Sequence, residues 1–383
     1  MSGEEPQAED AGSDGDYTAS ESDDDDDDND DGEYRRLVVD IGYGTTQYGL
    51  AGNDNITPKC LRNTHDNEGK YAHAINRSKL DLMNVNWEQM ESMWEWIFEK
   101  DLKVESDECC VISTVSPYGP RAYAEKLAEM LFETHEVPGI YLGVPAVFCL
   151  YAQGMTTGVV VDSGECITSA IPVYDGIPIA SAAKQLNFGG RDISAYLERH
   201  LQTRGVDVKS LADLNIVDTI KKEVCVCGVP ADDGHETYEM PDGKKIEIDA
   251  DFPVNAAQQF FFNPLQLDWD DTDMEEALHD VLHSTIMNCP MDSRRDLWGN
   301  TILTGGNTMF KGFAESLYKK LKPLPGCRNV NLKIKADAAR DNQAWVGASV
   351  VASMDSFMNN LIPAEVYDEE GPEVVHKLNI FSL

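Results

Sequence analysis

Two short segments combine residue types that together can hold a phosphate group and a metal ion. In the first, the apolar run at residues 37–39 ends at Asp40 and enters a glycine-containing turn. Glycines at 42 and 44 let successive backbone N–H groups point at one spot, which makes an anion site. Asp40, at the end of the run, could hold a hydrated Mg²⁺ beside bound phosphates. Residues 37–52 are therefore predicted to form two strands joined by a tight turn that faces a phosphate.

The same pattern occurs a second time, in residues 159–168. The repeat pairs Asp40 with Asp162, Gly42 with Gly164, and Thr46 with Thr168. A third glycine turn, at Gly305 and Gly306, again follows apolar residues. One such turn is most often an ordinary hairpin or helix cap. Two Asp-Gly hairpins and a Gly-Gly turn in one chain instead predict two related lobes, each offering one hairpin to a common site.

Charge separates the start of the chain from the rest. The chain has 383 residues, enough for two domains, and a net charge of −37. Residues 1–34 hold 16 acidic residues and no Lys or Arg, so we expect a disordered acidic tail. The tail either keeps the protein in solution or docks on a basic partner such as histones. Residues 35–383 keep a net charge of −21, which argues against direct contact with nucleic acid.

Apolar runs and cysteines place the chain in a broad class. No apolar run reaches transmembrane length and no signal-peptide pattern is present, so we expect no membrane partner. The nine cysteines form no zinc-binding spacing. We expect reduced, mostly buried thiols in a cytosolic or nuclear protein.

Hydrophobic periodicity predicts alternating helices and strands. After a loop-rich stretch at 53–86, three tryptophans within residues 87–98 indicate a helix with a large apolar face, which we expect to pack in the core. Further helices are predicted at 121–134, 193–202, 213–226 and 313–321. Another follows the acidic run at 270–273 and ends at 287, and a long last helix is predicted at 345–357. Strands are predicted at 109–115, 140–144, 171–179 and 245–248. The alternation indicates the α/β class.

Eight segments, in chain order, are similar to segments of actin-related proteins. They are VVDIGYGT, NWEQMESMWEWIF, LYAQGMTTGVVVDSGE, GGRDISAYL, YEMPDGKKIEI, RRDLWGNTILTGGNTMFKGF, WVGASVVAS and YDEEGPEVVH. The chain thus resembles the actin family from residue 37 to 376, without an assigned subfamily. The resemblance implies an α/β, two-lobed actin-like ATPase fold, in which each lobe is built on a ribonuclease-H-like core and the lobes close on ATP and a divalent metal.

The resemblance also implies a domain plan. The first lobe comprises residues 35–152 and 343–383, and the second comprises 153–342. Only 34 residues separate Gly52 from Trp87, and only 12 separate Cys225 from Tyr238. Both intervals are short for the family, which implies a reduced small subdomain at about 53–86 and a reduced upper subdomain within about 189–273. Both reductions fall on the face that the family calls the pointed end.

Site residues follow from the matched motifs. Asp40 and Asp162 would face the metal, ATP or ADP being the implied cofactor with Mg²⁺. Glycines and their neighbours in the two hairpins would wrap the phosphates: Gly42, Tyr43, Gly44, Ser163 and Gly164. A second set would surround the adenosine: Gly190, Lys221, Gly305, Gly306, Met309 and Phe310.

Several family positions are substituted. Gln47 stands where a lysine reaches the phosphates, which removes a positive charge. Pro145 stands where a glutamine orients the attacking water, and proline has no side-chain donor or acceptor. Further departures are Cys166 for glycine, Ser169 for histidine, Asp218 for arginine, Lys222 for glutamate and Asp341 for lysine. We expect ATP hydrolysis to be absent or very slow and nucleotide binding to be weakened; the alternative is an empty cleft held shut by packing.

The opposite, barbed face matches the family better. Its apolar cleft between the lower subdomains would be formed by Tyr151, Gly154, Thr156, Val351, Met354 and Phe357, and would accept a partner helix. The leading hypothesis is a structural, cytoplasmic cytoskeletal subunit that joins other actin-family subunits or a multiprotein complex and ends a filament at its pointed end. The alternatives are a nuclear subunit of a chromatin-remodelling complex and a polymerising ATPase.

Overall fold

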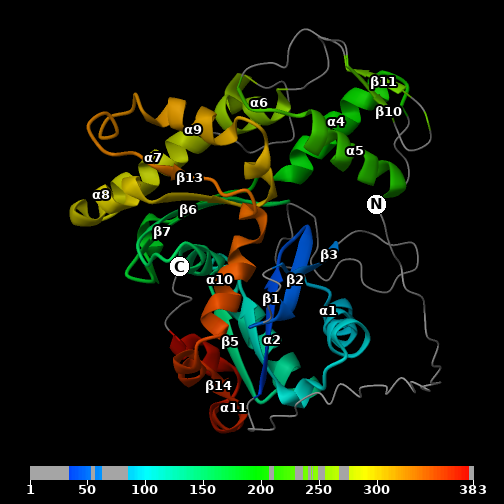
Figure 1. Ribbon diagram of the computed structural model, residues 1–383, viewed down its shortest axis with the longest axis vertical. Coiled ribbons are helices and arrows are strands. Elements are labelled where there is room, and N and C mark those ends of the chain that lie inside the picture. Colours follow the sequence, from blue (N-terminus) through cyan, green and yellow to red (C-terminus); the bar gives the residue numbers. More distant parts are fainter. Residues whose placement is uncertain are drawn as a thin grey trace, which may run out of the picture. The chain divides into compact units, whose positions relative to one another are not determined.

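Two mixed β-sheets form the framework of the computed structural model (Figure 1). The structure describes residues 34–52, 57–62, 85–206, 211–228, 236–239, 243, 245–248, 255–266 and 276–378. The acidic tail up to residue 33, most of the loop-rich stretch at 53–86 and the acidic run at 270–273 lie outside these residues. The predicted α/β, two-lobed fold is confirmed by the two sheets and the helices packed on them.

The first sheet has the strand order β14-β5-β4-β1-β2-β3. Its strands are β1 (Arg35–Ile41), β2 (Thr45–Leu50), β3 (Lys59–Arg62), β4 (Cys109–Thr114), β5 (Gly139–Gly143) and β14 (Ile362–Pro363). β1 pairs antiparallel with β2, which confirms the first predicted hairpin, and parallel with β4. The antiparallel register places Asp40 directly opposite Gln47, so both side chains lie on one face of the sheet.

The second sheet repeats this arrangement, with the order β13-β12-β6-β7-β8 and β9 also paired to β7. Its strands are β6 (Gly158–Ser163), β7 (Thr168–Tyr174), β8 (Ile177–Pro178), β9 (Lys184–Leu186), β12 (Thr301–Thr304) and β13 (Ile334–Lys335). β6 pairs antiparallel with β7 and parallel with β12, as β1 pairs with β2 and β4. The repeated Asp-Gly motif thus has a structural counterpart in each sheet.

Helices pack on the sheets. They are α1 (Trp87–Glu95), α2 (Arg121–Glu129), α3 (Pro145–Ala152), α4 (Gly190–Thr203), α5 (Leu211–Val224), α6 (Ala256–Phe262), α7 (Leu278–Asn288), α8 (Met291–Gly299), α9 (Phe313–Leu321), α10 (Gln343–Ala352) and α11 (Ala364–Glu370). α1 and α2 continue as π-helical turns, Trp96–Leu102 and Met130–Thr134. A separate hairpin joins β10 (Glu236–Glu239) and β11 (Lys245–Ile248). No helix among the described residues has the length and apolar character needed to cross a membrane.

Helix α1 shows why the tryptophan-rich segment is helical and buried. The side chain of Asn86 caps its first turn, with Oδ1 accepting from the N–H of Gln89 at 3.2 Å. Met90, Trp94 and Ile97 recur at helical spacing and are fully buried in the core of the first sheet. The prediction of core packing for this segment is confirmed. All nine cysteines are free and eight are buried, as predicted.

Three sequence expectations about helices are wrong. The helix predicted at 345–357 ends at Ala352, because Met354 is extended (φ −89°, ψ 126°) and a 3₁₀ segment, Asp355–Asn360, follows. It is not the last helix, since α11 lies beyond it, and α5 stops at Val224, two residues before its predicted end. Helix α3 was not predicted. Its eight residues are almost uniformly apolar and carry no helical period, and its one start signal is Pro145 at the first position.

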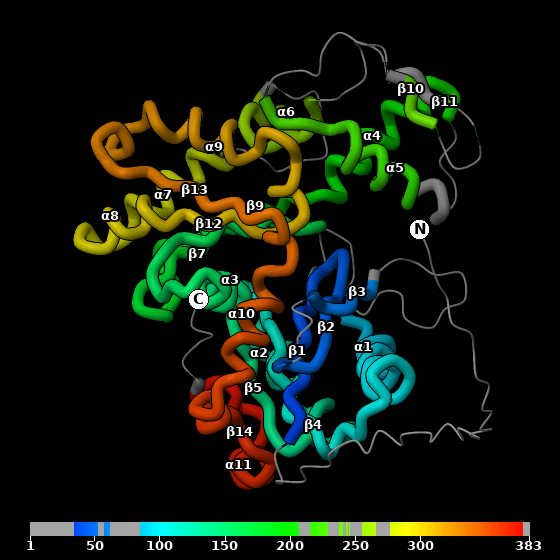
Figure 2. Tube along the Cα trace, in the orientation of Figure 1, coloured from blue at the N-terminus to red at the C-terminus, as the bar shows by residue number. Residues whose placement is uncertain are grey.

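Helices α3 and α10 lie side by side where the chain passes between the two sheets (Figure 2). α3 follows β5 of the first sheet and leads to β6 of the second, whereas α10 follows β13 of the second and leads back to β14 of the first. They approach backbone to backbone: a Cβ added to Gly347 would lie 1.8 Å from the carbonyl oxygen of Phe148. Only glycine permits this approach.

We therefore expect Gly347→Ala to destabilise the fold by about 3 kcal/mol, because α3 and α10 must separate to admit the methyl group. Urea unfolding measures the change. Gly299→Ala is the matched control: its added Cβ would meet nothing closer than 3.9 Å, so the variant should be as stable as wild type or about 1 kcal/mol more stable. Equal stabilities for the two variants would contradict the close helix contact.

Candidate functional site

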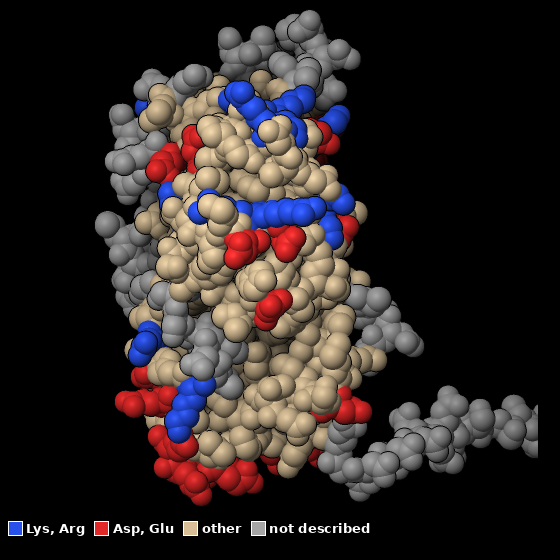
Figure 3. All heavy atoms as spheres, turned by 90° about the vertical axis from the view of Figure 1, so that its left-hand side faces the viewer, with Lys and Arg blue, Asp and Glu red and all other residues tan. Residues whose placement is uncertain are grey.

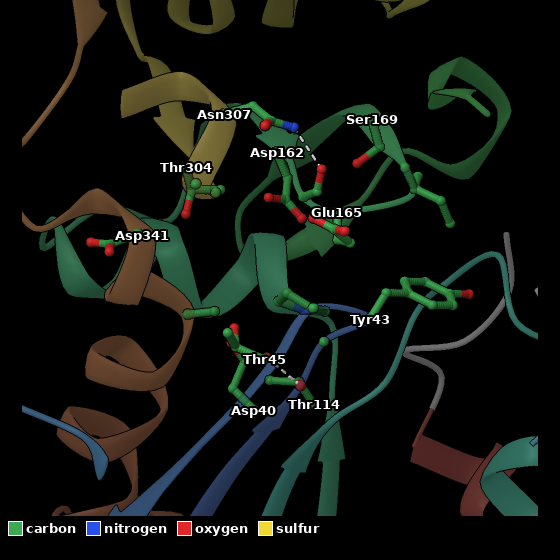
Figure 4. Close-up of a pocket in the computed structure, with 18 of the residues that line it drawn as sticks. Asp40, Tyr43, Thr45, Thr114, Asp162, Glu165, Ser169, Thr304, Asn307 and Asp341 are labelled. Atoms are coloured by element: carbon green, nitrogen blue, oxygen red, sulfur yellow. Dashed lines mark hydrogen bonds between the residues drawn. The ribbon is translucent and has the colours of Figure 1, made fainter. Parts of the chain in front are cut away.

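One cavity of about 350 Å³ is lined by both Asp-Gly hairpins, the Gly-Gly turn and the start of α3 (Figure 4). The site residues expected from sequence that line it are Asp40, Gly42, Tyr43, Gly44, Pro145, Asp162, Gly164, Lys221, Gly305, Gly306, Met309 and Phe310. Ser163 and Gly190 are buried beside it. Of the substituted positions, Gln47, Ser169, Lys222 and Asp341 also line the cavity.

Glycines let the loops around the cavity approach one another. In the first hairpin the N–H of Gly42 donates to the carbonyl of Thr45 at 3.0 Å, and a Cβ on Gly42 would lie 2.8 Å from that oxygen. Gly44 packs against Glu165 of the second hairpin, whose Cβ would be 3.0 Å from an added methyl group. Gly305 has φ 85°, and its added Cβ would be 2.4 Å from the carbonyl of Ser163. The three turns therefore meet at one place.

Asp40 is held at the end of β1 by its parallel neighbour β4. Thr114, the last residue of β4, donates to Oδ1 of Asp40 at 2.6 Å and accepts from the N–H of Ile41 at 3.1 Å. Burial raises the pKa of Asp40, although the hydrogen bond from Thr114 opposes the shift. Thr114 was missed from sequence; its position at the carboxyl end of the 109–115 strand was the available signal.

Asp162 ends β6 in the corresponding place. Burial, and then the nearby charge of Asp40, raise the pKa of Asp162 to about 7. Cys149 on α3 is buried next to both carboxylates; burial, followed by their charges, raises its pKa. Asp40 and Asp162 are half-buried carboxylates whose charges act on each other, an arrangement that a divalent cation would stabilise.

The second hairpin is fixed from inside the protein. Oγ of Ser163 lies 2.8 Å from Oγ1 of Thr168, which donates to the carbonyl of Phe188 at 2.9 Å. Nδ2 of Asn307 donates to Oγ of Ser163 at 3.1 Å and to the carbonyl of Gly164 at 2.6 Å. Figure 4 shows Asn307 beside Asp162 of the second hairpin. Asn307 therefore couples the Gly-Gly turn to the hairpin. Asn307 was not among the predicted site residues, although it directly follows Gly306.

Lys221 is buried, and its ammonium is already bonded within the protein. Nζ donates to the carbonyl of Gly190 at 3.0 Å, to Oγ of Ser194 at 2.7 Å and to Oδ1 of Asp218 at 3.0 Å. Burial by itself would raise the pKa of Asp218, but the charge of Lys221 and hydrogen bonds from Ser194 and Lys221 hold it below its usual value. Asp218 is thus the internal counter-ion of Lys221.

Gln47 is also bonded within the protein. Its Nε2 donates to the carbonyl of Asp341 at 3.0 Å and to Oδ1 of Asn342 at 2.9 Å. Its Oε1 is buried without a hydrogen-bond partner. Because Asp341 offers a backbone carbonyl, the amide must point its NH₂ group there, which leaves an acceptor rather than a donor unbonded.

The residues of the cavity fit a phosphate group only in part. The glycine hairpins and the carboxylate pair suit phosphates neutralised by Mg²⁺, which commonly takes one or two carboxylates plus phosphate oxygens. Among the described residues, no group of three or more His, Cys, Asp or Glu side chains could hold a metal by itself. The charged lining comprises four carboxylates, Asp40, Asp162, Glu165 and Asp341, and two lysines, Lys221 and Lys222. Among the described residues that line the cavity, the cations are Lys221 and Lys222, and the ammonium of Lys221 is bonded to Asp218, so a phosphate there would meet more carboxylates than ammonium groups.

The predicted partner cleft is only partly exposed. Met354 is 50 % exposed, and Thr156 and Gly154 are exposed, Gly154 with nothing within 4 Å of an added Cβ. Val351 and Phe357 are each 8 % exposed and pack in the core cluster that contains Trp345. The exposed apolar surface at this place therefore consists mainly of Met354, with Tyr151 half-buried beside the cores.

Comparison with protein-family models gives one match. The model described as Actin matches residues 32–379, which is most of the chain and includes every strand and helix named above.

Asp162 should make the stability of the protein depend on pH. Its pKa is raised from 3.8 to about 7, so between these pH values the folded chain keeps a proton that the unfolded chain loses. Wild-type stability should fall over that interval. Asp162→Asn lacks this titration, and we expect it to match wild type near pH 4 and to exceed it by about 2–4 kcal/mol at pH 8.

Urea unfolding across pH 4–8 measures the difference between Asp162→Asn and wild type. Asp296→Asn is the control for a lost carboxylate, because Asp296 is exposed on α8 and lies outside its first turn; a change within about 0.5 kcal/mol of wild type is expected at each pH. A constant difference between Asp162→Asn and wild type at all pH values would contradict the assigned burial and charge.

The Lys221–Asp218 pair supplies a second prediction. The two side chains are 5 % and 25 % exposed, so Lys221→Met leaves a largely buried carboxylate without its counter-ion. We expect a loss of about 2–3 kcal/mol in unfolding free energy. Asp218→Asn combined with Lys221→Met should cost much less than the sum of the single changes. Lys319→Met, at an exposed position on α9, controls for removal of a lysine; additive costs in the double variant would show that the pair is not coupled.

Proposed function

Because the chain belongs to the actin family, we propose that it is a structural actin-related subunit that binds Mg²⁺–nucleotide weakly, hydrolyses ATP little or not at all, and ends a filament or completes a multiprotein complex in the cytoskeleton.

The observation that carries this proposal is the place of Pro145. It forms the first turn of α3 and lines the cavity that Asp40 and Asp162 also line. By resemblance, this is the position from which a glutamine orients the attacking water. Proline offers no side-chain hydrogen bond there, so an attacking water would have no aligned acceptor from this residue.

The charges of the cavity support the same proposal. Four carboxylates line it, Gln47 replaces the phosphate-contacting lysine, and the ammonium of Lys221 is bonded to Asp218. A nucleotide would have to bring its own neutralising cation, which favours weak, Mg²⁺-dependent binding. Such a cavity suits a subunit that acts through its contacts with other subunits rather than through ATP hydrolysis.

The proposed position at a filament end rests on the sequence intervals. The 34 residues between Gly52 and Trp87 and the 12 between Cys225 and Tyr238 are short for the family's pointed-end subdomains. A subunit that keeps the barbed face and lacks part of the pointed face would accept one longitudinal neighbour only. The proposed lobe boundaries, 35–152 with 343–383 and 153–342, follow the same resemblance.

Charge is unevenly distributed over the described surface, which supports a role in oriented assembly. Figure 3 shows Asp and Glu gathered at the lower end of one face, where α11 lies, and Lys and Arg mainly above. α11 and its neighbour carry Glu365, Asp368, Glu369, Glu370 and Glu373, whereas residues 311–335 contain seven Lys or Arg and one Glu. Separated charges of opposite sign orient an approaching partner before contact.

A second candidate function is supported by the composition of residues 1–34. Sixteen acidic residues without a Lys or Arg would suit contact with histones, as in a nuclear subunit of a chromatin-remodelling complex. Affinity purification from native cells separates the candidates: cytoskeletal actin-family subunits support the first proposal, and remodelling ATPases with histones support the second. A phosphate-release rate near that of actin would instead favour a polymerising ATPase.

Seeded polymerisation tests the end-binding role directly. We expect the full chain to stop elongation at one end of actin-family filament seeds and to form no filament alone. Met354→Glu should weaken this effect at least tenfold, since a charge replaces the exposed apolar side chain of the partner cleft. Leu265→Glu, at an 83 % exposed apolar residue on another element, should behave as wild type. Self-elongation by the full chain would refute the proposal.

A further inference from the structure

The segment that leads into α10 is bonded to both sheets at adjacent residues. On one side, Oγ1 of Thr304, the last residue of β12 in the second sheet, donates to the carbonyl of Arg340 at 2.7 Å. On the other, Nε2 of Gln47, in β2 of the first sheet, donates to Asp341 and Asn342 at 3.0 and 2.9 Å. Residues 340–342 thus form the link between a strand end of one sheet and a strand of the other.

The link is reinforced immediately before and after these residues. The guanidinium of Arg340 donates to the carbonyl of Thr308 at 2.7 Å and to its Oγ1 at 3.1 Å, which fixes the link to the second sheet's Gly-Gly turn region. Trp345, in the first turn of α10, donates from Nε1 to the carbonyl of Val38 at 3.1 Å, in β1 of the first sheet. Along the chain, the residues that Gln47 contacts, Asp341 and Asn342, lie between Arg340 and Trp345.

Gln47 is well placed to hold the link rigidly. Gln47 is only 7 % exposed and lies on the β1–β2 hairpin. Both hydrogen bonds of its NH₂ group go to the link and neither to a neighbouring strand. Low exposure keeps water from competing for these bonds, which makes their loss more costly than that of surface bonds.

The same geometry removes Gln47 from any role with a phosphate. Its donors are used by the link, and its remaining Oε1 is an acceptor that a phosphate oxygen would not bond. Asp40 lies directly opposite on β1, so the pair presents a carboxylate and a carbonyl oxygen rather than a cation. The position resembling the family's phosphate contact has become a contact within the protein.

We propose that Gln47 is a positioning residue that fastens the 340–342 link to the first sheet, so that the two walls of the cavity are held together by the chain itself and not by a bound nucleotide. This proposal deepens the proposed weak binding of nucleotide and rests on it for its biological meaning. The contacts themselves are those of the protein without nucleotide.

Hydrogen exchange of the full chain without nucleotide tests it. In Gln47→Met, which keeps the length of the side chain and removes its amide, amides in peptides covering residues 337–347 should exchange about tenfold faster. Gln185→Met is the matched control: Nε2 of Gln185 donates to Asn187 at 2.9 Å within one sheet region, and its Oε1 is likewise unbonded. That control should leave residues 337–347 at the wild-type rate.

Asn342→Ala approaches the same contact from the other side and guards against a folding defect in the Gln47 variant. It removes one of the two bonds, so we expect about threefold faster exchange in the same peptides and little further effect when it is combined with Gln47→Met. Unchanged exchange in both Gln47→Met and Asn342→Ala would overturn the proposal. So would faster exchange spread equally over β1 and β2, which a general loss of packing would produce.

Gln47→Lys tests whether this position can contact either a phosphate or the 340–342 link. The ammonium would lie opposite Asp40 and reach the cavity, while the bonds to the link are altered. In thermal unfolding with Mg²⁺–ADP, we expect a clear rise in Tm for Gln47→Lys and a much smaller one for wild type. If Mg²⁺–ADP slows exchange at 337–347 in wild type tenfold or more, the link depends on nucleotide and the proposal is wrong. If the chain does not stop filament elongation but Gln47→Met exchanges faster at 337–347, the proposed function is rejected and the role of Gln47 stands.

Discussion

The close contact between α3 and α10 sets how the two sheets are joined. Each helix carries the chain from one sheet to the other, and the absence of a side chain at Gly347 lets their backbones meet. Because the helices run between sheets of opposite lobes, their packing sets where the two Asp-Gly hairpins stand. The cavity is therefore a consequence of helix packing as much as of its own lining residues.

Within the cavity, the side chains are bonded mainly to the protein itself. Lys221 is neutralised by Asp218, Asn307 holds the second hairpin, and Gln47 holds the link before α10. The carboxylates of Asp40 and Asp162, by contrast, lie close enough for the charge of Asp40 to raise the pKa of Asp162. The protein's own side chains thus bond the walls of the site, and its two acids would gain from a cation.

This pattern connects the two proposals. A subunit that ends a filament or completes a complex needs a defined surface rather than a cycle of opening and closing. By resemblance to the family, Pro145 stands where a side chain would position water, and Gln47 stands where a side chain would contact phosphate but is bonded within the protein. Both proposals therefore describe a cavity that serves a fixed arrangement of the lobes, and the exposed Met354 would be open to partners.

Elements whose signals are local could be predicted from the residues alone. Glycines after Asp40 and Asp162 permit the tight turns that a hairpin needs, so both hairpins could be predicted, and helical spacing identified α1, α2 and α9. It did not predict α3, whose uniform apolarity has no period, nor the end of α10 at Ala352. The contacts of Gln47 with Asn342, of Asn307 with Gly164 and of Lys221 with Gly190 could not be predicted, because hydrogen bonds between residues 31 to 295 positions apart depend on how helices and sheets pack. Residue types fixed which chemistry was available, and packing determined whether each group faces a ligand or the protein.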